Sequence, residues 1–167
     1  MSKSGKFAVA ESFRDAMRLF PTGVTVVTTT NADQPYGMTA NAVSSLSLEP
    51  PMVLVCFERE ARTLAAVRGS RAFAINVLAT TQQKLAKQFA TKHSESIKWK
   101  GISWQQRGDL PMLDGALCWI GCSLSELIEA GDHMIAVGTV NSVATGEGSP
   151  LIYYRGLFGS IGAQPSR

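Results

Sequence analysis

The recurrence of short segments rich in Val, Ile, Thr and aromatic residues constrains the fold more than any other feature of this chain. Residues that favour turns, chiefly Gly, Pro, Asn and Asp, stand between these segments. Such a pattern is typical of β-strands joined by turns. It predicts about seven strands, at 23–30, 37–47, 52–57, 73–78, 117–127, 134–144 and 150–160. Several connections are short, so we expect mainly antiparallel pairing and a long sheet that tends to close into a barrel.

Three helices are predicted between the strands. The first spans 12–20, where a serine and an aspartate three residues later resemble a capping box and a proline follows the last residue. The second spans 61–68 and should end at Gly69. The third runs from 80 to about 91, with leucine and phenylalanine spaced four apart on one face.

The remaining segments carry weak structural signals. Residues 92–112 are polar and are expected to be irregular, and residues 1–10 and 161–167 are expected to be loose ends. The strand at 52–57 is continuously apolar, which favours burial on both faces. A length of 167 residues fits one domain. The sequence therefore predicts a mainly β fold with a few helices (α+β), in one domain that spans 1–167.

Composition excludes several classes of function. The chain is 45% hydrophobic and 17% charged, which is ordinary for a globular protein, and its net charge is only +3. Lysines and arginines are scattered, so no nucleic-acid partner is expected. No apolar run is long enough to cross a membrane. An odd number of cysteines, three, and an N-terminus without an apolar signal region indicate reduced thiols and a cytoplasmic location.

Common catalytic and binding motifs are absent. The sequence contains no Gly-rich dinucleotide fingerprint between a strand and a helix and no phosphate-binding P-loop. It has only two histidines, so a histidine-rich metal site is excluded. Cys118 and Cys122 would stand about 13 Å apart along a strand, too far to share a metal. We interpret them as core residues and expect no metal.

The stretch GMTANAVSSLS at 37–47 reads as a strand but offers little side-chain bulk. Its members are mostly small or short and polar, and such residues fill a core badly. A planar ring system could lie flat on this surface, while backbone amides bond its polar edge. Tight packing against another part of the protein is the alternative interpretation.

Three other polar signals lie beside predicted strands. Arg62 and Thr63 begin a predicted helix, where amides, a hydroxyl and a guanidinium suit a phosphate, although a helix cap with a solvated arginine is equally compatible. Gly131-Asp132-His133 marks a tight turn before a strand, and its histidine could simply be exposed. The 153–156 segment, Tyr-Tyr-Arg-Gly, could stack on a ring and hold a phosphate, or could be ordinary strand.

A resemblance to a known family adds to these signals. FRDAMRLFPTGVTVVTT, GMTANAVSSLSLEPPMVLVCF, FAINVLATTQQKLAKQFA, GDH and PLIYYRG are similar, in order and spacing, to the short-chain flavin reductases, the reductase partners of two-component flavin monooxygenases. The similarity covers residues 13–159. It implies an antiparallel FMN-binding split barrel, a homodimer, and hydride transfer from NADH or NADPH to FMN, FAD or riboflavin, with a flavin-dependent monooxygenase as functional partner.

The resemblance also implies site residues. It assigns His133 as the catalytic residue facing the nicotinamide nucleotide, together with Tyr153, Tyr154, Arg155 and Gly156. It assigns flavin binding to residues of four segments: Tyr36, Gly37, Met38, Thr39, Ala40, Asn41, Ala42, Ser44, Ser45, Cys56, Phe57, Glu58, Arg62, Thr63 and Thr91. The choice between FMN and FAD, and between NADH and NADPH, stays open.

The expected chemistry needs little from the protein. Nicotinamide C4 gives a hydride to flavin N5, so the protein mainly stacks the two rings with these atoms about 3 to 3.5 Å apart. The alternative is a non-enzymatic flavin or small-ligand carrier with the same barrel, which would bind flavin and leave NADH unoxidised. An oxidase of the pyridoxamine-phosphate type is a further alternative, but no matching basic substrate cluster is visible.

Overall fold

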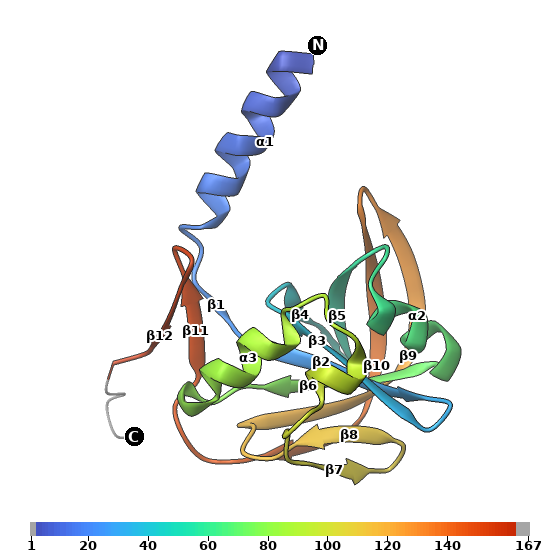
Figure 1. Ribbon diagram of the computed structural model, residues 1–167. Coiled ribbons are helices and arrows are strands. Elements are labelled where there is room, and N and C mark those ends of the chain that lie inside the picture. Colours follow the sequence, from blue (N-terminus) through green and yellow to red (C-terminus); the bar gives the residue numbers. More distant parts are fainter. Residues whose placement is uncertain (1–2, 163–167) are drawn as a thin grey trace.

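The computed structural model describes residues 3–162 and is built mainly from antiparallel strands (Figure 1). The strands are β1 Thr22–Gly23, β2 Thr25–Asn31, β3 Gln34–Ala40, β4 Val43–Leu48, β5 Pro51–Glu58, β6 Ala72–Val77, β7 Trp104–Arg107, β8 Leu110–Leu113, β9 Cys118–Ala130, β10 His133–Thr145, β11 Leu151–Tyr154 and β12 Leu157–Ser160. The helices are α1 Lys3–Met17, α2 Arg62–Ser70, α3 Gln83–Phe89 and α4 Glu95–Lys98, with a 3₁₀ turn η1 at Thr80–Gln82. The predicted fold class, mainly β with few helices, is confirmed.

Seven strands form the central sheet, in the order β3-β2-β6-β9-β10-β5-β4. Every pairing within it is antiparallel. Its edge strands, β3 and β4, follow one another along the chain, but within residues 3–162 they are not hydrogen-bonded to each other as strands. The sheet therefore curls without closing, and the barrel is split.

The core occupies the inside of this curled sheet. Its largest fully buried side chains include Phe57, Phe73 and Ile75, with Leu64 and Val67 of α2 packed against them. A second cluster lies beneath α3, where Phe89 meets residues of β2 and β11. Burying one such side chain contributes about 1.5–3 kcal/mol. The two clusters fix α2 and α3 on the sheet, at the place where the cavity described below opens.

A small sheet and a projecting helix lie at one end of the molecule. Strands β1, β11 and β12 pair in the order β1-β11-β12. The backbone N–H of Val24 donates to the Leu151 carbonyl and its carbonyl accepts from the Leu78 N–H, which connects this sheet to the core. Helix α1 extends away from the rest of the chain above this sheet (Figure 1). Over the described residues, no helix has the length and apolarity that crossing a membrane requires.

The first helix differs from its prediction. It begins at Lys3 and ends at Met17, whereas the sequence pattern indicated 12–20. Residues 3–10, which were expected to be a loose end, are thus helical, because Lys, Ala, Phe and Glu are compatible with a helix that continues through the supposed capping box. Residues 1–2 and 163–167 of the predicted loose ends lie outside the described residues.

The segment 37–47 is two strands. β3 ends at Ala40, Asn41 and Ala42 pair in neither strand, and β4 begins at Val43. The prediction of one strand was wrong because the chain passes here from one edge of the sheet to the other.

The strand predicted at 52–57 is β5. It alternates between buried and more exposed residues, so it is not buried on both faces as expected.

The segment 92–112 is more ordered than its polar sequence indicated. It contains α4, β7 and the start of β8, and the β7–β8 hairpin packs on the core through Leu110 and Leu113.

The prediction of a single last strand at 150–160 was also incomplete. The chain turns at Arg155 and Gly156, both with positive φ, and forms the hairpin of β11 and β12. This is the backbone that two-residue hairpin turns adopt.

Smaller differences concern one helix end, two long strands and the cysteines. α2 runs past Gly69 and is ended by Arg71 in the left-handed conformation, and β9 and β10 are each longer than predicted. Cys122 is buried, as expected for a core residue, and Cys118 is half-buried. Burial raises the pKa of the Cys122 thiol to about 12, so it stays protonated near neutral pH and is a poor nucleophile.

Candidate functional site

A cavity of about 630 Å³ opens between the end of β3, the N-terminus of α2, α3 and the β11–β12 hairpin. This volume lies in the range of small-molecule sites. About half of the lining residues are ones that the family resemblance assigns to the site. They come from four separate segments: Met38, Thr39, Asn41, Glu58, Arg62, Thr63, Thr91, Tyr153 and Gly156. The fold brings these segments together although they are far apart in the sequence.

The end of β3 forms one wall. Met38, Thr39 and Asn41 line the cavity, and the Thr39 hydroxyl donates a 2.6 Å hydrogen bond to the Ala86 carbonyl of α3. This bond holds the strand against the helix. The wall presents little bulk apart from Met38, as the composition of 37–47 suggested.

Gly37 has a packing reason for its small size. A Cβ atom at this position would lie 2.6 Å from the Phe89 ring and 3.3 Å from the Trp99 ring. Its backbone N–H donates to the Glu95 carboxylate at 3.1 Å, and its carbonyl accepts from the Lys98 ammonium at 3.0 Å. Both polar groups of Gly37 are therefore already paired within the protein.

Glu95 and Lys98 form a buried charged pair beside this strand. Glu95 is 4% exposed and Lys98 is 5% exposed, and their charged atoms lie 3.5 Å apart. Both belong to α4, inside the segment that the sequence pattern left irregular. Burial lowers the pKa of Lys98 more than its pairing with Glu95 raises it. Sequence reasoning missed both residues, because a polar segment gives no sign that it will be buried.

The start of α2 contributes Arg62 and Thr63. Thr63 is buried and lines the cavity, and the N-cap position, Ala61, supplies no side-chain cap. The Arg62 guanidinium donates to Glu95 at 3.4 Å, to the Lys92 carbonyl at 3.3 Å, and to the His93 carbonyl. A guanidinium has five N–H groups, so donors remain on its exposed side. Arg62 thus connects α2 to the loop before α4 and still faces the cavity.

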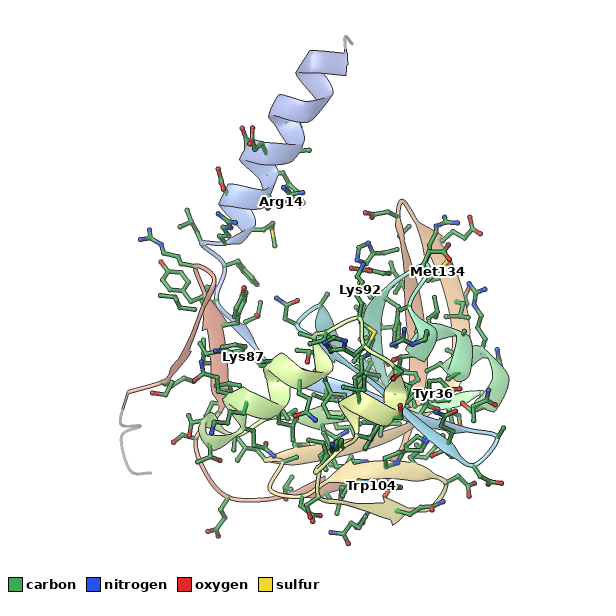
Figure 2. All side chains as sticks on the ribbon, in the orientation of Figure 1. Arg14, Tyr36, Lys87, Lys92, Trp104 and Met134 are labelled. Carbon is green, nitrogen blue, oxygen red and sulfur yellow. The ribbon has the colours of Figure 1, made fainter. Side chains whose placement is uncertain are left out.

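The cavity carries an excess of positive charge. Arg62, Lys87, Lys92 and Lys98 line it, against the carboxylates of Glu58 and Glu60. Lys92 lies 3.5 Å from Glu58, and Figure 2 shows it beyond the end of α3, with Lys87 on that helix. Phe89 and Thr91 complete this side. The arrangement favours an anionic ligand with an apolar portion.

The β11–β12 hairpin closes the other end. Tyr153, Gly156 and Phe158 line the cavity, and the Tyr153 and Phe158 rings lie 5.3 Å apart at 59°. Lys87 lies over the Phe158 ring at 5.9 Å. Tyr154 and Arg155 stack on each other at 5.4 Å and do not line the cavity that the described residues form.

His133 lies beside the cavity and not in its lining. It is the first residue of β10 and pairs across the sheet with Glu58, which does line the cavity. Its Nδ1 lies 2.7 Å from the Asp132 carboxylate. Contact with His133 lowers the pKa of that carboxyl group. Arg59 donates to the Gly131 carbonyl at 2.9 Å and so fixes the turn that carries the histidine.

Other assigned residues lie apart from the cavity that residues 3–162 form. Phe57 and Ala40 are buried in the core, Cys56 is half-buried on β5, and Tyr36 donates to Gln34 near the β2–β3 turn. Three exposed assigned residues, one in the crossing and two in edge strand β4, are also outside the lining: Ala42, Ser44 and Ser45.

Comparison with known proteins agrees with this geometry. The model of the flavin reductase like domain matches residues 17–162. The chain belongs to this flavin reductase family. A Rhodococcus opacus relative, the reductase component of 4-nitrophenol 4-monooxygenase/4-nitrocatechol 2-monooxygenase, is 42% identical over 147 residues, which cover 88% of this chain and 78% of that protein. An NADH-dependent flavin reductase of Rhodococcus sp is 36% identical over 151 residues, covering 89% and 84%.

Solved structures of the flavin reductase family share the fold. The NADH:FAD oxidoreductase of Streptomyces globisporus C-1027, solved in complex with NAD and FAD fragments, superposes with a TM-score of 0.86 at 31% identity. The superposition covers 92% of this chain and 93% of that one. The family assignment made from sequence motifs is therefore confirmed, and so is the split-barrel type of fold.

The donor set of the cavity fits a flavin nucleotide. Phe89 and Met38 offer apolar surface to a ring system, and Thr63 with Arg62 offers a hydroxyl and a guanidinium to a phosphate. Over the described residues, no group of His, Cys, Asp and Glu side chains has the arrangement of a metal site.

Proposed function

We propose that this chain is an NAD(P)H-dependent flavin reductase that supplies reduced flavin to a partner monooxygenase. The observation that carries the proposal is a cavity with apolar surface and four cationic side chains, Arg62, Lys87, Lys92 and Lys98, in a chain of the flavin reductase family. The names of its relatives, reductase components of monooxygenases and an NADH-dependent flavin reductase, support the same conclusion.

The residues around the cavity have distinct roles in this proposal. A bound flavin supplies the redox chemistry by accepting a hydride from reduced nicotinamide. The end of β3 provides the surface for the ring system, and Arg62 with Thr63 binds a phosphate at the start of α2. The β11–β12 hairpin and His133 face the nicotinamide nucleotide. The protein contributes binding and orientation, and no nucleophile is needed.

The remaining assignments are part of the proposal. Ala42, Ser44 and Ser45 bind flavin only if it extends along the crossing between β3 and β4, and Tyr36 binds it only if it extends toward the β2–β3 turn. We also propose a single functional domain, a homodimer and a cytoplasmic location. The exposed apolar side chains of α1, such as Phe13, support dimerisation, and the free cysteines are compatible with a reducing compartment.

A spectrophotometric assay tests the function. Purified protein is mixed with NADH or NADPH and with FMN, FAD or riboflavin, and the absorbance of the reduced nicotinamide is followed. We expect its oxidation to depend on both flavin and protein. Flavin binding without oxidation would instead identify a non-enzymatic carrier, and absence of both would contradict the proposal.

A further inference from the structure

The proposed function uses Lys98 only as one of the cations that line the cavity, and it gives no role to Glu95, which pairs with Lys98. Both side chains are more than nine-tenths buried, and Lys98 lines the cavity. Burying two charges is costly unless their hydrogen bonds are satisfied. The hydrogen bonds around this pair therefore indicate what else it is arranged to bind.

The Lys98 ammonium has one donor more than the protein uses. An ammonium group carries three N–H bonds. Among residues 3–162, its acceptors are the Gly37 carbonyl at 3.0 Å and the Glu95 carboxylate at 3.5 Å. The third N–H belongs to a side chain that lines the cavity. A ligand acceptor there would complete its hydrogen bonding.

The local charges are also unbalanced. Arg62 and Lys98 share one carboxylate, Glu95, so two cations face one anion at this wall. Arg62 further lowers the pKa of Lys98, after the larger effect of burial. An anionic group in the cavity would offset the excess positive charge and favour the charged form of Lys98.

We propose that Lys98 is a phosphate-binding residue of the cavity and that Glu95 is the positioning residue that holds it. The inference rests on the proposed function and extends it from the start of α2 to α4. Glu95 fixes three donors at once, since it accepts from Arg62, Lys98 and the Gly37 amide. The phosphate belongs either to the flavin nucleotide or to the nicotinamide dinucleotide.

The test compares ligands that differ by one phosphate. Lys98→Met keeps the aliphatic stem and removes the charge. Lys100→Met is the matched control, because Lys100 is exposed, lies two residues away and does not line the cavity. Dissociation constants of FMN and riboflavin are measured by flavin fluorescence on the apoprotein, and the KM for NADH is measured with riboflavin as acceptor.

The flavin and dinucleotide sources give different results. A flavin phosphate predicts that Lys98→Met weakens FMN binding about tenfold or more, with riboflavin binding nearly unchanged. If Lys98 instead binds a phosphate of the dinucleotide, Lys98→Met should raise the KM for NADH by the same factor and leave both flavin dissociation constants unchanged. Lys100→Met should leave all three constants unchanged. The proposal would be overturned if Lys98→Met weakened FMN and riboflavin binding equally and left the KM for NADH unchanged. It would also be overturned if none of the three constants changed.

Two further variants separate binding from folding. Glu95→Gln retains the acceptor for the Gly37 amide but lowers the attraction for Lys98. It should therefore change the same quantity as Lys98→Met, which is either FMN affinity relative to riboflavin affinity or the KM for NADH, and in the same direction. A merely structural role would change the FMN and riboflavin affinities equally and leave the KM for NADH unchanged. The double variant Glu95→Gln/Lys98→Met removes both buried charges, so it tests phosphate discrimination if the single variant unfolds.

Failure of the proposed function would be visible separately. Wild-type protein that neither binds flavin nor oxidises NADH would contradict the reductase assignment. In that case inorganic pyrophosphate, titrated by calorimetry into wild type and Lys98→Met, still tests the anion site. We expect pyrophosphate to bind the wild type more tightly, and equal binding would overturn the role of Lys98.

Discussion

At the scale of single residues, His133 is held by its neighbours before any ligand arrives. Its Nδ1 contacts the Asp132 carboxylate, and Arg59 bonds the carbonyl of Gly131 in the same turn. Its side chain remains 42% exposed. An oriented, accessible imidazole beside the cavity suits contact with a second substrate more than packing.

Substitution of this histidine gives the first residue-scale prediction. His133→Ala should raise the KM for NADH or NADPH about tenfold, the value of one lost contact of about 1.4 kcal/mol, and leave the flavin dissociation constant nearly unchanged. Steady-state kinetics and flavin fluorescence measure the two quantities. His93→Ala is the control, because the same residue type is lost at an exposed site outside the cavity lining. If both constants rose together for His133→Ala, the histidine would have a structural role.

At the scale of elements, packing between β3 and the segment from α3 to α4 determines the wall of the cavity. The Phe89 ring fills the space that a side chain at Gly37 would need, and the Phe89 and Trp99 rings meet edge to face at 5.0 Å. The α4 residues Glu95 and Lys98 bond both backbone groups of Gly37. The small residue at position 37 thus follows from tight packing, the alternative interpretation of this stretch.

The element-scale prediction concerns this contact. Gly37→Ala should destabilise the protein by about 1–3 kcal/mol, because the added methyl group forces the Phe89 ring to move. Urea denaturation measures the free energy of unfolding. Gly23→Ala is the matched control, since a Cβ atom there meets nothing within 4 Å. Similar free energies for both variants would show that the ring moves aside at little cost.

At the scale of the whole molecule, α1 is the element with the fewest contacts. It extends away from the sheets (Figure 1), and its apolar side chains Phe13 and Met17 are 65% and 49% exposed. A helix of 15 residues is only marginally stable in water without packing. A second copy of the chain would provide the missing surface, in agreement with the proposed homodimer.

This gives a prediction about assembly. The wild type should have the mass of a dimer in light scattering coupled to gel filtration, and Phe13→Asp should shift it toward the monomer. Ser12→Asp introduces the same charge at the preceding exposed residue and should remain dimeric. A monomeric wild type, or a Phe13→Asp variant that dimerises as strongly as wild type, would contradict a role of α1 in dimerisation.

The local sequence determined that the fold is mainly β, that its strands pair antiparallel, and where α2, α3 and most segments of the cavity lie. Alternating β-branched residues and turn residues act over a few positions, so these features can be read directly from the chain. Met38, Arg62, Thr63 and Tyr153 were assigned to the site by the family resemblance of such segments, and all of them line the cavity.

Only the tertiary structure decided which polar residues are buried and which sheet edges stay open. Glu95 and Lys98 lie in a polar segment whose pattern is that of an exposed loop, yet they are buried because β3 and α2, distant in sequence, pack against them. The break at Asn41 and Ala42 likewise depends on the chain passing between opposite edges of the sheet. Such features arise from long-range contacts, which local sequence preferences do not encode.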